Sequence, residues 1–253
     1  MLRSAAWVLA GILLSAASIG ETWAQSCCSP ATTPTGAIAH PGVRGGSFEL
    51  GLYAQHYSLA GGRRGTEDFD FPGDRQANAQ IMVFAGRVGI TDRLSASLLV
   101  PLNRRERSDV AFDGVRVSRT YSGLGDIAAL GYLRLTKPLS RTEWTVGGGV
   151  KLATGKSRAE DDTGELPEEL QPGTGANDAL ITSLFSHAIS ANFTGSAGFT
   201  WRLTGTLTKI DELPNSDEEV VRQFSFGNEL LYGIGVAWTP DYRWGFHLGL
   251  EGR

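Results

Sequence analysis

The chain has few of the residues that would indicate a metal protein, a disulfide-rich protein or a nucleic-acid-binding protein. Its two cysteines, Cys27 and Cys28, are adjacent and cannot form a disulfide framework or a four-ligand zinc site. Only 4 of the 23 basic residues are lysines, and 27 acidic residues give a net charge of −4, which does not favour nucleic acid as a partner. No stretch after the N-terminus reaches the roughly 18 uninterrupted apolar residues of a spanning helix. We therefore expect no bound metal, no cofactor and no transmembrane helix.

Glycine is abundant, and the N-terminus resembles a secretory signal peptide. There are 33 glycines among 253 residues, nearly twice the usual share of about 7%. Arg3 supplies a positive charge and residues 5–19 form a short apolar core, so we predict a signal peptide over 1–24. Residues 25–45, rich in Ser, Thr, Pro and Gly, are expected to form an irregular periplasmic segment. The two cysteines fall in this segment, where an exposed flexible stretch, a disulfide and a lipid anchor all remain open.

From residue 46 onward, apolar residues alternate with small or polar ones at a period of two. The clearest run is 193–208, where Phe193, Phe199 and Trp201 share one parity and threonines dominate the other. Side chains on a strand alternate between two faces, whereas a helix would mix the two sets. The pattern predicts nine strands, over 46–59, 77–90, 94–102, 120–135, 144–154, 175–189, 193–208, 224–238 and 244–252.

The connections between these strands alternate between short turns and long polar loops. Long loops are expected over 60–76, 103–119, 155–174 and 209–223, of which the third and fourth are acidic and 103–119 is rich in arginine. We interpret them as solvated external loops near lipopolysaccharide. Short turns on one side and long loops on the other, after a signal peptide, are typical of an outer-membrane β-barrel.

The fold class predicted is therefore all-β, an antiparallel transmembrane β-barrel over 46–253 in the bacterial outer membrane. Its environment would be outer-membrane lipid and lipopolysaccharide. Nine strands is an odd number, whereas bacterial single-chain barrels have an even number. We expect a barrel that is truncated at the C-terminus and has 10–12 strands when complete; a miscount between 103 and 135 is the alternative.

A secreted β-sandwich is the soluble alternative, since its strands also alternate. The face of the strands that carries the small and polar residues is too rich in Gly, Ser and Thr to form the core of such a sandwich. The aromatic residues also cluster near strand ends, as in the interfacial girdles of membrane barrels. Examples are Phe224 and Phe226 at one end, and Trp238 and Trp244 at the other.

The polar parity defines a set of side chains expected to face the lumen. Two opposite-charge pairs should form across neighbouring strands, because their members lie at similar depth: Arg202 with Glu229, and Glu49 with Arg87. Asp126 is expected to act mainly as a structural hydrogen-bond acceptor near the rim. The full predicted lumen-facing set is Glu49, Arg87, Asp126, Arg134, Lys151, Arg202, Glu229, His247 and Glu251.

Three glycine-containing motifs carry a family resemblance. They are Tyr-Ser-Gly-Leu-Gly-Asp-Ile at 121–127, Gly-Val-Lys-Leu-Ala-Thr-Gly-Lys at 149–156 and Leu-Gln-Pro-Gly-Thr-Gly at 170–175. Their spacing resembles the outer-membrane family named for the MetA pathway of phenol degradation, over most of 46–253. The resemblance implies a monomeric barrel that lets small compounds, aromatic or hydrophobic ones among them, cross the outer membrane. It assigns no binding residues here.

Two other function classes remain. An enzyme barrel would need a histidine and an acid beside a nucleophile or water. His40, His56, His187 and His247 are the only histidines, and their positions and parities do not bring two of them together near a serine or aspartate. We therefore expect no enzyme and no catalytic residue. The second alternative is a structural or adhesive barrel whose long loops bind an external partner.

Overall fold

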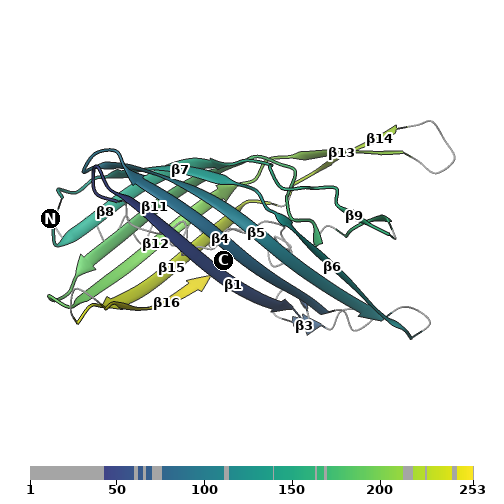
Figure 1. The fold of residues 1–253 in the computed structure, drawn as a ribbon, viewed down its shortest axis with the longest axis horizontal. Helices are drawn as coiled ribbons and strands as arrows, with labels where there is room; N and C mark the ends of the chain where they lie inside the picture. The colour runs from purple at the N-terminus through teal and green to yellow at the C-terminus, as the bar shows by residue number, and fades with distance from the viewer. Residues whose placement is uncertain are drawn as a thin grey trace.

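One long antiparallel sheet curls on itself to form the body of the computed structural model (Figure 1). The predicted signal peptide, most of the 25–45 segment, both cysteines and His40 lie outside the described residues, so these predictions are untested. The structure describes residues 43–59, 62–64, 67–69, 76–110, 114–138, 140–162, 164–167, 170–212, 219–225, 227–240 and 244–252.

The main sheet follows the chain order from strand to strand, with antiparallel pairing throughout. Its order is β1-β4-β5-β7-β8-β11-β12-β15-β16, and β6 also pairs with β5. The bounds are β1 Phe48–Leu59, β4 Gln76–Gly89, β5 Leu94–Val110, β6 Arg116–Leu124, β7 Ala128–Arg134, β8 Thr142–Lys151, β11 Asp178–Ala188, β12 Phe193–Leu203, β15 Glu229–Trp238 and β16 Phe246–Gly252.

Each of the nine predicted strands has a counterpart in this sheet, and the four predicted long loops contain further strands. The 103–119 region is not a loop: β5 continues to Val110 and pairs with β6 from Arg116 onward, in a hairpin. The other three loops contain short hairpins of their own. These are β2 (Gly62–Arg64) with β3 (Glu67–Phe69), β9 (Glu160–Asp161) with β10 (Gly164–Glu165), and β13 (Leu207–Glu212) with β14 (Glu219–Phe224).

The predicted strand 120–135 is interrupted at its centre by a β-bulge. Leu102 pairs with Leu124 and Leu99 pairs with Ala128, so two residues of β5 lie opposite the three residues 125–127. An extra residue reverses which parity faces inward. At the bulge, the carbonyl of Pro101 accepts a hydrogen bond from the amide of Gly125 at 2.8 Å. As a result, Gly125 and Asp126 are both buried although they are consecutive.

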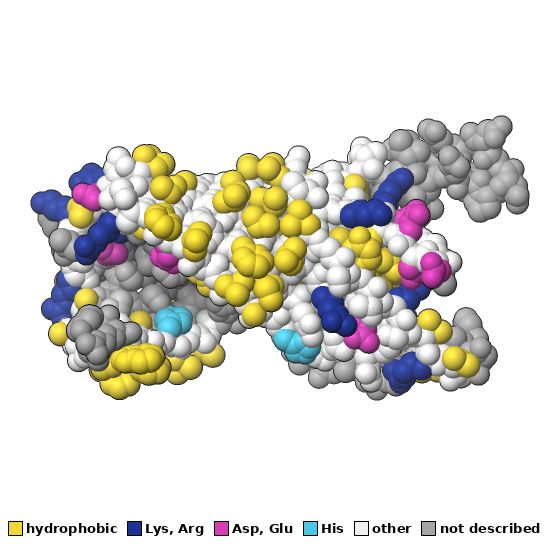
Figure 2. All heavy atoms as spheres, viewed as in Figure 1, with side chains coloured by type: hydrophobic (Ala, Val, Ile, Leu, Met, Phe, Trp, Pro, Cys, Tyr) yellow, Lys and Arg dark blue, Asp and Glu magenta, His cyan; other side chains and the backbone are white. Residues whose placement is uncertain are grey.

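The outer face of the sheet is apolar, as the alternation predicted. Figure 2 shows apolar side chains over the middle of this face and most charged side chains toward its two ends. Phe48 and Leu50 are 78% and 79% exposed, far above the exposure of apolar side chains in a soluble core. At the end with the short turns, Trp238 stacks on Phe193 and Phe246, with ring centroids 6.3 and 5.6 Å apart.

The inner face is less polar than the sequence predicted. Polar residues do line much of it, but β4, β5, β7 and β11 also direct apolar side chains inward. The reason is the tight curl of the sheet, which lets inner side chains from several strands pack against one another. This buried apolar cluster consists of Ile81, Val83, Ala85, Leu99, Ala128, Leu130, Tyr132, Leu180 and Leu184, with Tyr53 packed against it.

Strands β1 and β16 stand at the two ends of the strand order in the main sheet. Within the described ranges, β1 pairs with β4 and β16 pairs with β15, and no pairing between β1 and β16 occurs there. The expectation of 10–12 strands therefore stays a prediction.

Candidate functional site

Most of the predicted lumen-facing residues lie on the inner face of the sheet, and several of them contact one another. Asp126, Lys151, Arg202 and Glu229 are buried near the strand ends that carry the long hairpins. Glu49, Arg87 and Arg134 lie near the opposite ends, beside the short turns. His247 has inward parity and is exposed, and the side chain of Glu251 is outside the described part of the chain.

The buried charges form an alternating row, which we call the charge ladder, of Asp126, Lys151, Asp178, Arg202 and Glu229. Each step is an ion pair: Lys151 Nζ lies 2.6 Å from Asp126 Oδ2 and 3.1 Å from Asp178 Oδ2. Arg202 Nε lies 2.7 Å from Asp178 Oδ2, and Arg202 Nη1 lies 2.8 Å from Glu229 Oε2. The ladder crosses five neighbouring strand ends, from the bulge before β7 to β15. Its five side chains are 0–8% exposed.

The register of the sheet explains why the ladder forms. Lys151 pairs with Ala128 on one side and with Asp178 on the other, and Arg202 pairs with Glu229. Directly opposed residues on one face have close Cβ atoms, so opposite charges meet without long side-chain reach. Burial of single charges would be costly, and each ladder member is compensated by a neighbour of opposite sign.

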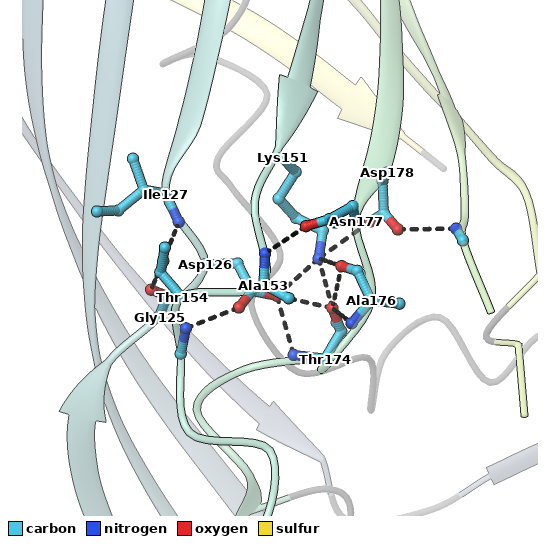
Figure 3. A network of polar contacts seen from close by, with 12 residues as sticks. Gly125, Asp126, Ile127, Lys151, Ala153, Thr154, Thr174, Ala176, Asn177 and Asp178 are labelled. Carbon is cyan, nitrogen blue, oxygen red and sulfur yellow. Dashed lines mark hydrogen bonds and ion pairs between the residues drawn. The ribbon is translucent and has the colours of Figure 1, made fainter. Parts of the chain in front are cut away.

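Asp126 is the most highly connected acceptor in the ladder. Its carboxylate accepts hydrogen bonds from Lys151 Nζ, from the amide of Gly155 at 3.0 Å and from the amide of Thr174 at 2.9 Å. The Thr174 hydroxyl donates a fourth at 2.7 Å. Figure 3 shows Lys151 and Thr174, from two other parts of the chain, directed toward Asp126. The predicted structural role of Asp126 is therefore consistent with its contacts, and the three motifs that carried the family resemblance meet at this carboxylate.

Asp178 was missed by the sequence analysis, although it joins the two halves of the ladder. Its side chain is 1% exposed, accepts a hydrogen bond from Arg202 Nε and forms an ion pair with Lys151. Its Oδ1 also accepts from the amide of Gly205 at 3.0 Å. The strand prediction placed this residue within 175–189, and its parity with Leu180 and Thr182 could have identified it as inward-facing.

The second predicted pair is also present. Arg87 Nη1 lies 2.7 Å from Glu49 Oε1, and Arg87 Nη2 donates to the hydroxyl of Tyr53 at 2.7 Å. The guanidinium also lies over the Tyr53 ring, 5.5 Å from its centroid. Farther round the sheet, Arg134 Nη1 is 4.0 Å from Glu143 Oε1.

The predicted external loop 155–174 is the main correction to the sequence analysis. We call residues 170–176 the inner turn, because they pack on the inner face of the sheet. The Pro172 carbonyl accepts from Asn103 Nδ2 on β5 at 2.9 Å, and the Ala176 carbonyl accepts from Lys151 Nζ at 2.9 Å. Leu170, Pro172 and Thr174 are almost fully buried. Charge composition suggested a solvated loop, but the residues that make these contacts are uncharged.

Close backbone packing gives the glycines of the motifs a specific role. A Cβ placed on Gly173 would lie 2.3 Å from the carbonyl oxygen of Gly155. On Gly125 it would lie 3.0 Å from Pro101 Cγ and 2.6 Å from Asn103 Nδ2. Only glycine allows this approach without displacement of neighbouring atoms.

A small apolar lobe adjoins the inner turn and shares Leu170 with it. Ala159, Leu166 and Leu170 are buried together, and Tyr121 of β6 packs against them. Gln171 closes the lobe: its Oε1 accepts from the Ala159 amide at 2.6 Å, and its Nε2 donates to the carbonyls of Leu166 and Ala159 at 2.8 and 3.2 Å. The exposed side chains of Glu160, Asp161, Asp162 and Glu165 point away from this packing.

The histidines form no catalytic arrangement in the described part of the chain. His56 is exposed on the outer face, and the Nδ1 of His187 lies 2.8 Å from the hydroxyl of Thr142 at the short-turn end. His247 is on β16, beside Gly235. Among the described residues, no group of three or more His, Cys, Asp or Glu side chains could hold a metal ion. In the same residues we find no helix with the length and apolarity needed to cross a membrane.

Comparisons with known proteins identify the fold. No family model and no curated protein matches the chain. Among solved structures, it is similar to the crystal structure of an outer membrane channel from Pseudomonas putida F1, with a TM-score of 0.57 and 13% sequence identity. The similarity covers 87% of this chain and 76% of that one. The fold is therefore that of an outer-membrane β-barrel; among the described residues, its main sheet has nine strands in chain order, with β6 paired beside β5.

Proposed function

We propose that this protein is a monomeric outer-membrane barrel that acts as a passive channel for small solutes, aromatic or hydrophobic compounds among them. The observation that carries the proposal is the contrast between the two faces of the sheet. The outer face is apolar and exposed, while the inner face holds charges that neutralise one another. The likeness of the fold to an outer membrane channel supports a channel in general.

The outer face supports the membrane location. A soluble protein rarely exposes a large continuous apolar surface, whereas outer-membrane barrels carry an apolar band with aromatic residues at its margins. Antiparallel pairing provides hydrogen bonds for the backbone N–H and C=O groups of strands that have a neighbour on each side. This matters inside lipid, where water is absent. Outer-membrane lipid and lipopolysaccharide would then be the natural surroundings of this surface.

The inner face supports a small and uncharged solute. Both signs of charge are paired along the charge ladder, so the interior does not present a strong field of one sign to an ion. The apolar cluster around Val83, Leu99 and Leu130 replaces part of the polar wall of a wide aqueous pore. Such a wall suits compounds with apolar surface, in line with the family resemblance of the three motifs.

Transport would be passive. The sequence contains no phosphate-binding loop of the ATP-hydrolysing type, and an outer membrane has no ready source of chemical energy. Movement would then follow the concentration gradient of the solute.

The location is tested by membrane fractionation of the native host. The protein is expected in the outer membrane, to change its gel mobility on heating, and to begin near Gln25 when its mass is measured. Recovery as a soluble periplasmic protein would contradict the proposal.

The channel is tested by single-channel recording of the purified protein in planar bilayers. We expect a small, nearly non-selective ion conductance that phenol, added to one side, reduces more strongly than glucose at equal concentration. Arg202→Ala should shift the reversal potential in a KCl gradient toward potassium, because Asp178 and Glu229 lose their partner. Arg104→Ala removes the same charge from the exposed outer side and serves as the control. Absence of any conductance would contradict the proposal.

A structural or adhesive barrel is the second candidate. The observation in its favour is that hairpin β13–β14 extends beyond the main sheet at one end (Figure 1). Folded, membrane-inserted protein that is impermeable to every solute would favour this function over a channel.

A further inference from the structure

The inner turn, residues 170–176, lies on the inner face of the sheet, where it can affect passage through the proposed channel. It runs from the apolar lobe to Asp178, the first residue of β11. On the way it contacts the inner face of strands that lie several positions away in the sheet, since Pro172 bonds to Asn103 on β5. A Cβ on Gly123 of β6 would also lie 3.5 Å from Pro172 Cγ. The inner turn therefore crosses the inner face from β11 to β5.

The inner turn is attached to this wall through Asp126 and its neighbours. Thr174 donates to Asp126 through both its amide and its hydroxyl, at 2.9 and 2.7 Å. Lys151 Nζ donates to the Ala176 carbonyl at 2.9 Å and contacts the Thr174 hydroxyl. These contacts use charged partners, which make stronger hydrogen bonds than neutral pairs do. All of these side chains are buried, so water competes little for the bonds.

We propose that the inner turn is a fixed constriction that determines which solutes pass, and that Asp126 is the residue that positions it. The proposal rests on the proposed channel function and deepens it. Backbone that lies on the inner wall removes cross-section from the lumen, at the level of the charge ladder. Because the turn is tied to β5, β8 and the bulge, the constriction has a defined width. It selects small solutes by size before they reach the apolar cluster farther along the wall.

The role of Asp126 follows from its acceptor capacity. A carboxylate can accept the four bonds from Lys151, Gly155 and Thr174 with two oxygens. Asp126→Asn keeps the size of the side chain but replaces one carboxylate oxygen with an amide NH2 group. This hydrogen-bond donor would face the donors that the carboxylate now accepts from. The inner turn should then leave the wall, and the channel should widen.

The test is a liposome swelling assay with arabinose, glucose, sucrose and raffinose, on protein shown to be folded by its heat-dependent gel mobility. Wild type should admit the smallest sugars only, and Asp126→Asn should admit larger sugars and raise single-channel conductance several-fold. Asp162→Asn is the matched control, since this exposed aspartate lies on the same connection without touching the inner turn. It should keep the wild-type cut-off.

Two neutral variants cover the case in which Asp126→Asn does not fold. Thr174→Val removes the hydroxyl bonds to Asp126 and Lys151, and Asn103→Ala removes the bond to Pro172. Neither leaves a buried charge without its ion-pair partner, and each should raise the size cut-off by less than Asp126→Asn. Combined, they should approach its effect.

The outcomes separate this proposal from the channel proposal. Folded variants that keep the cut-off of a conducting wild type would overturn the constriction and leave the channel intact. An impermeable wild type with permeable variants would support the constriction and overturn passive conduction by the native protein. Folded wild type and variants that are all impermeable would overturn both.

Discussion

Two acidic connections that look alike in the sequence have different structures. Residues 155–174 and 209–223 both connect two strands of the main sheet and are both rich in Asp and Glu. The first leads into the inner turn, whose residues are buried against β5 and β8. The second forms hairpin β13–β14, which pairs only within itself among the described strands and extends beyond the sheet (Figure 1).

The difference shows that the charge of a connection does not decide its location. In 155–174 the described acidic side chains, those of Glu160, Asp161, Asp162 and Glu165, are exposed. The buried contacts come from the apolar lobe, Pro172, Gly173 and Thr174. These residues contact groups on the inner face of the sheet, of which Asp126 is the most important. A connection folds inward when it carries groups that complete buried hydrogen bonds elsewhere in the fold.

The largest effect on stability is expected from Lys151→Met. Asp126 and Asp178 would be left buried beside each other without the cation that joins them, which costs about 3–5 kcal/mol for a broken buried pair. Urea unfolding in detergent, followed by tryptophan fluorescence, measures the loss. Lys156→Met removes an exposed lysine from the connection that follows β8 and should change stability by less than about 0.5 kcal/mol. Equal effects of the two changes would contradict a buried ladder.

A smaller loss is expected from Gly173→Ala. The new methyl group would lie 2.3 Å from the Gly155 carbonyl oxygen, so backbone must move and packing strain of about 1–3 kcal/mol should follow. The same unfolding experiment applies. Gly86→Ala is the control, because its nearest neighbour would be Leu50 Cδ2 at 3.9 Å, an ordinary contact. A stability change no larger than that of the control would show that the inner turn is loosely packed.

Glu49→Gln should cost less than either change in the inner turn or the ladder. Its partner Arg87 is buried, but the Glu49 side chain is 40% exposed, and Arg87 retains the Tyr53 hydroxyl and ring. Water therefore replaces part of the lost pair, and we expect about 1 kcal/mol or less. A loss as large as that of Lys151→Met would mean that this pair is shielded from water as completely as the ladder.

The smallest effect is expected from shortening hairpin β13–β14. Thr208 and Gln223 face each other across the hairpin, so an Asn-Gly turn can join them in place of 209–222. Leu207, which lies beside Gly175, is kept. Stability, conductance and size cut-off should all match wild type, as measured in the assays above. A wider size cut-off would assign this hairpin a part in the constriction.

The sequence predicted the strands and their facing better than the connections. Alternation identified the outer residues from Phe48 to Leu248, and it placed Arg202 beside Glu229, because both depend on a period of two. It could not place Pro172 against Asn103, since that contact joins residues 69 positions apart and has no periodic signal. The bulge at 125–126 could have been predicted, because an extra residue that interrupts the period of two in a strand indicates a bulge. Inner polarity was overestimated, since Val83 and Leu99 show that curvature can bury apolar side chains on the inner face.

Amide hydrogen exchange of the wild-type protein in lipid nanodiscs would compare the inner turn directly with hairpin β13–β14. The amides of Gly155, Gly173 and Thr174 should exchange as slowly as amides of the main sheet. Asp126 and the Lys156 carbonyl hold them in buried hydrogen bonds. Amides of β13 and β14 should exchange much faster. Exchange of the inner turn at the rate of this hairpin would contradict the claim that one acidic connection belongs to the interior and the other to the surface.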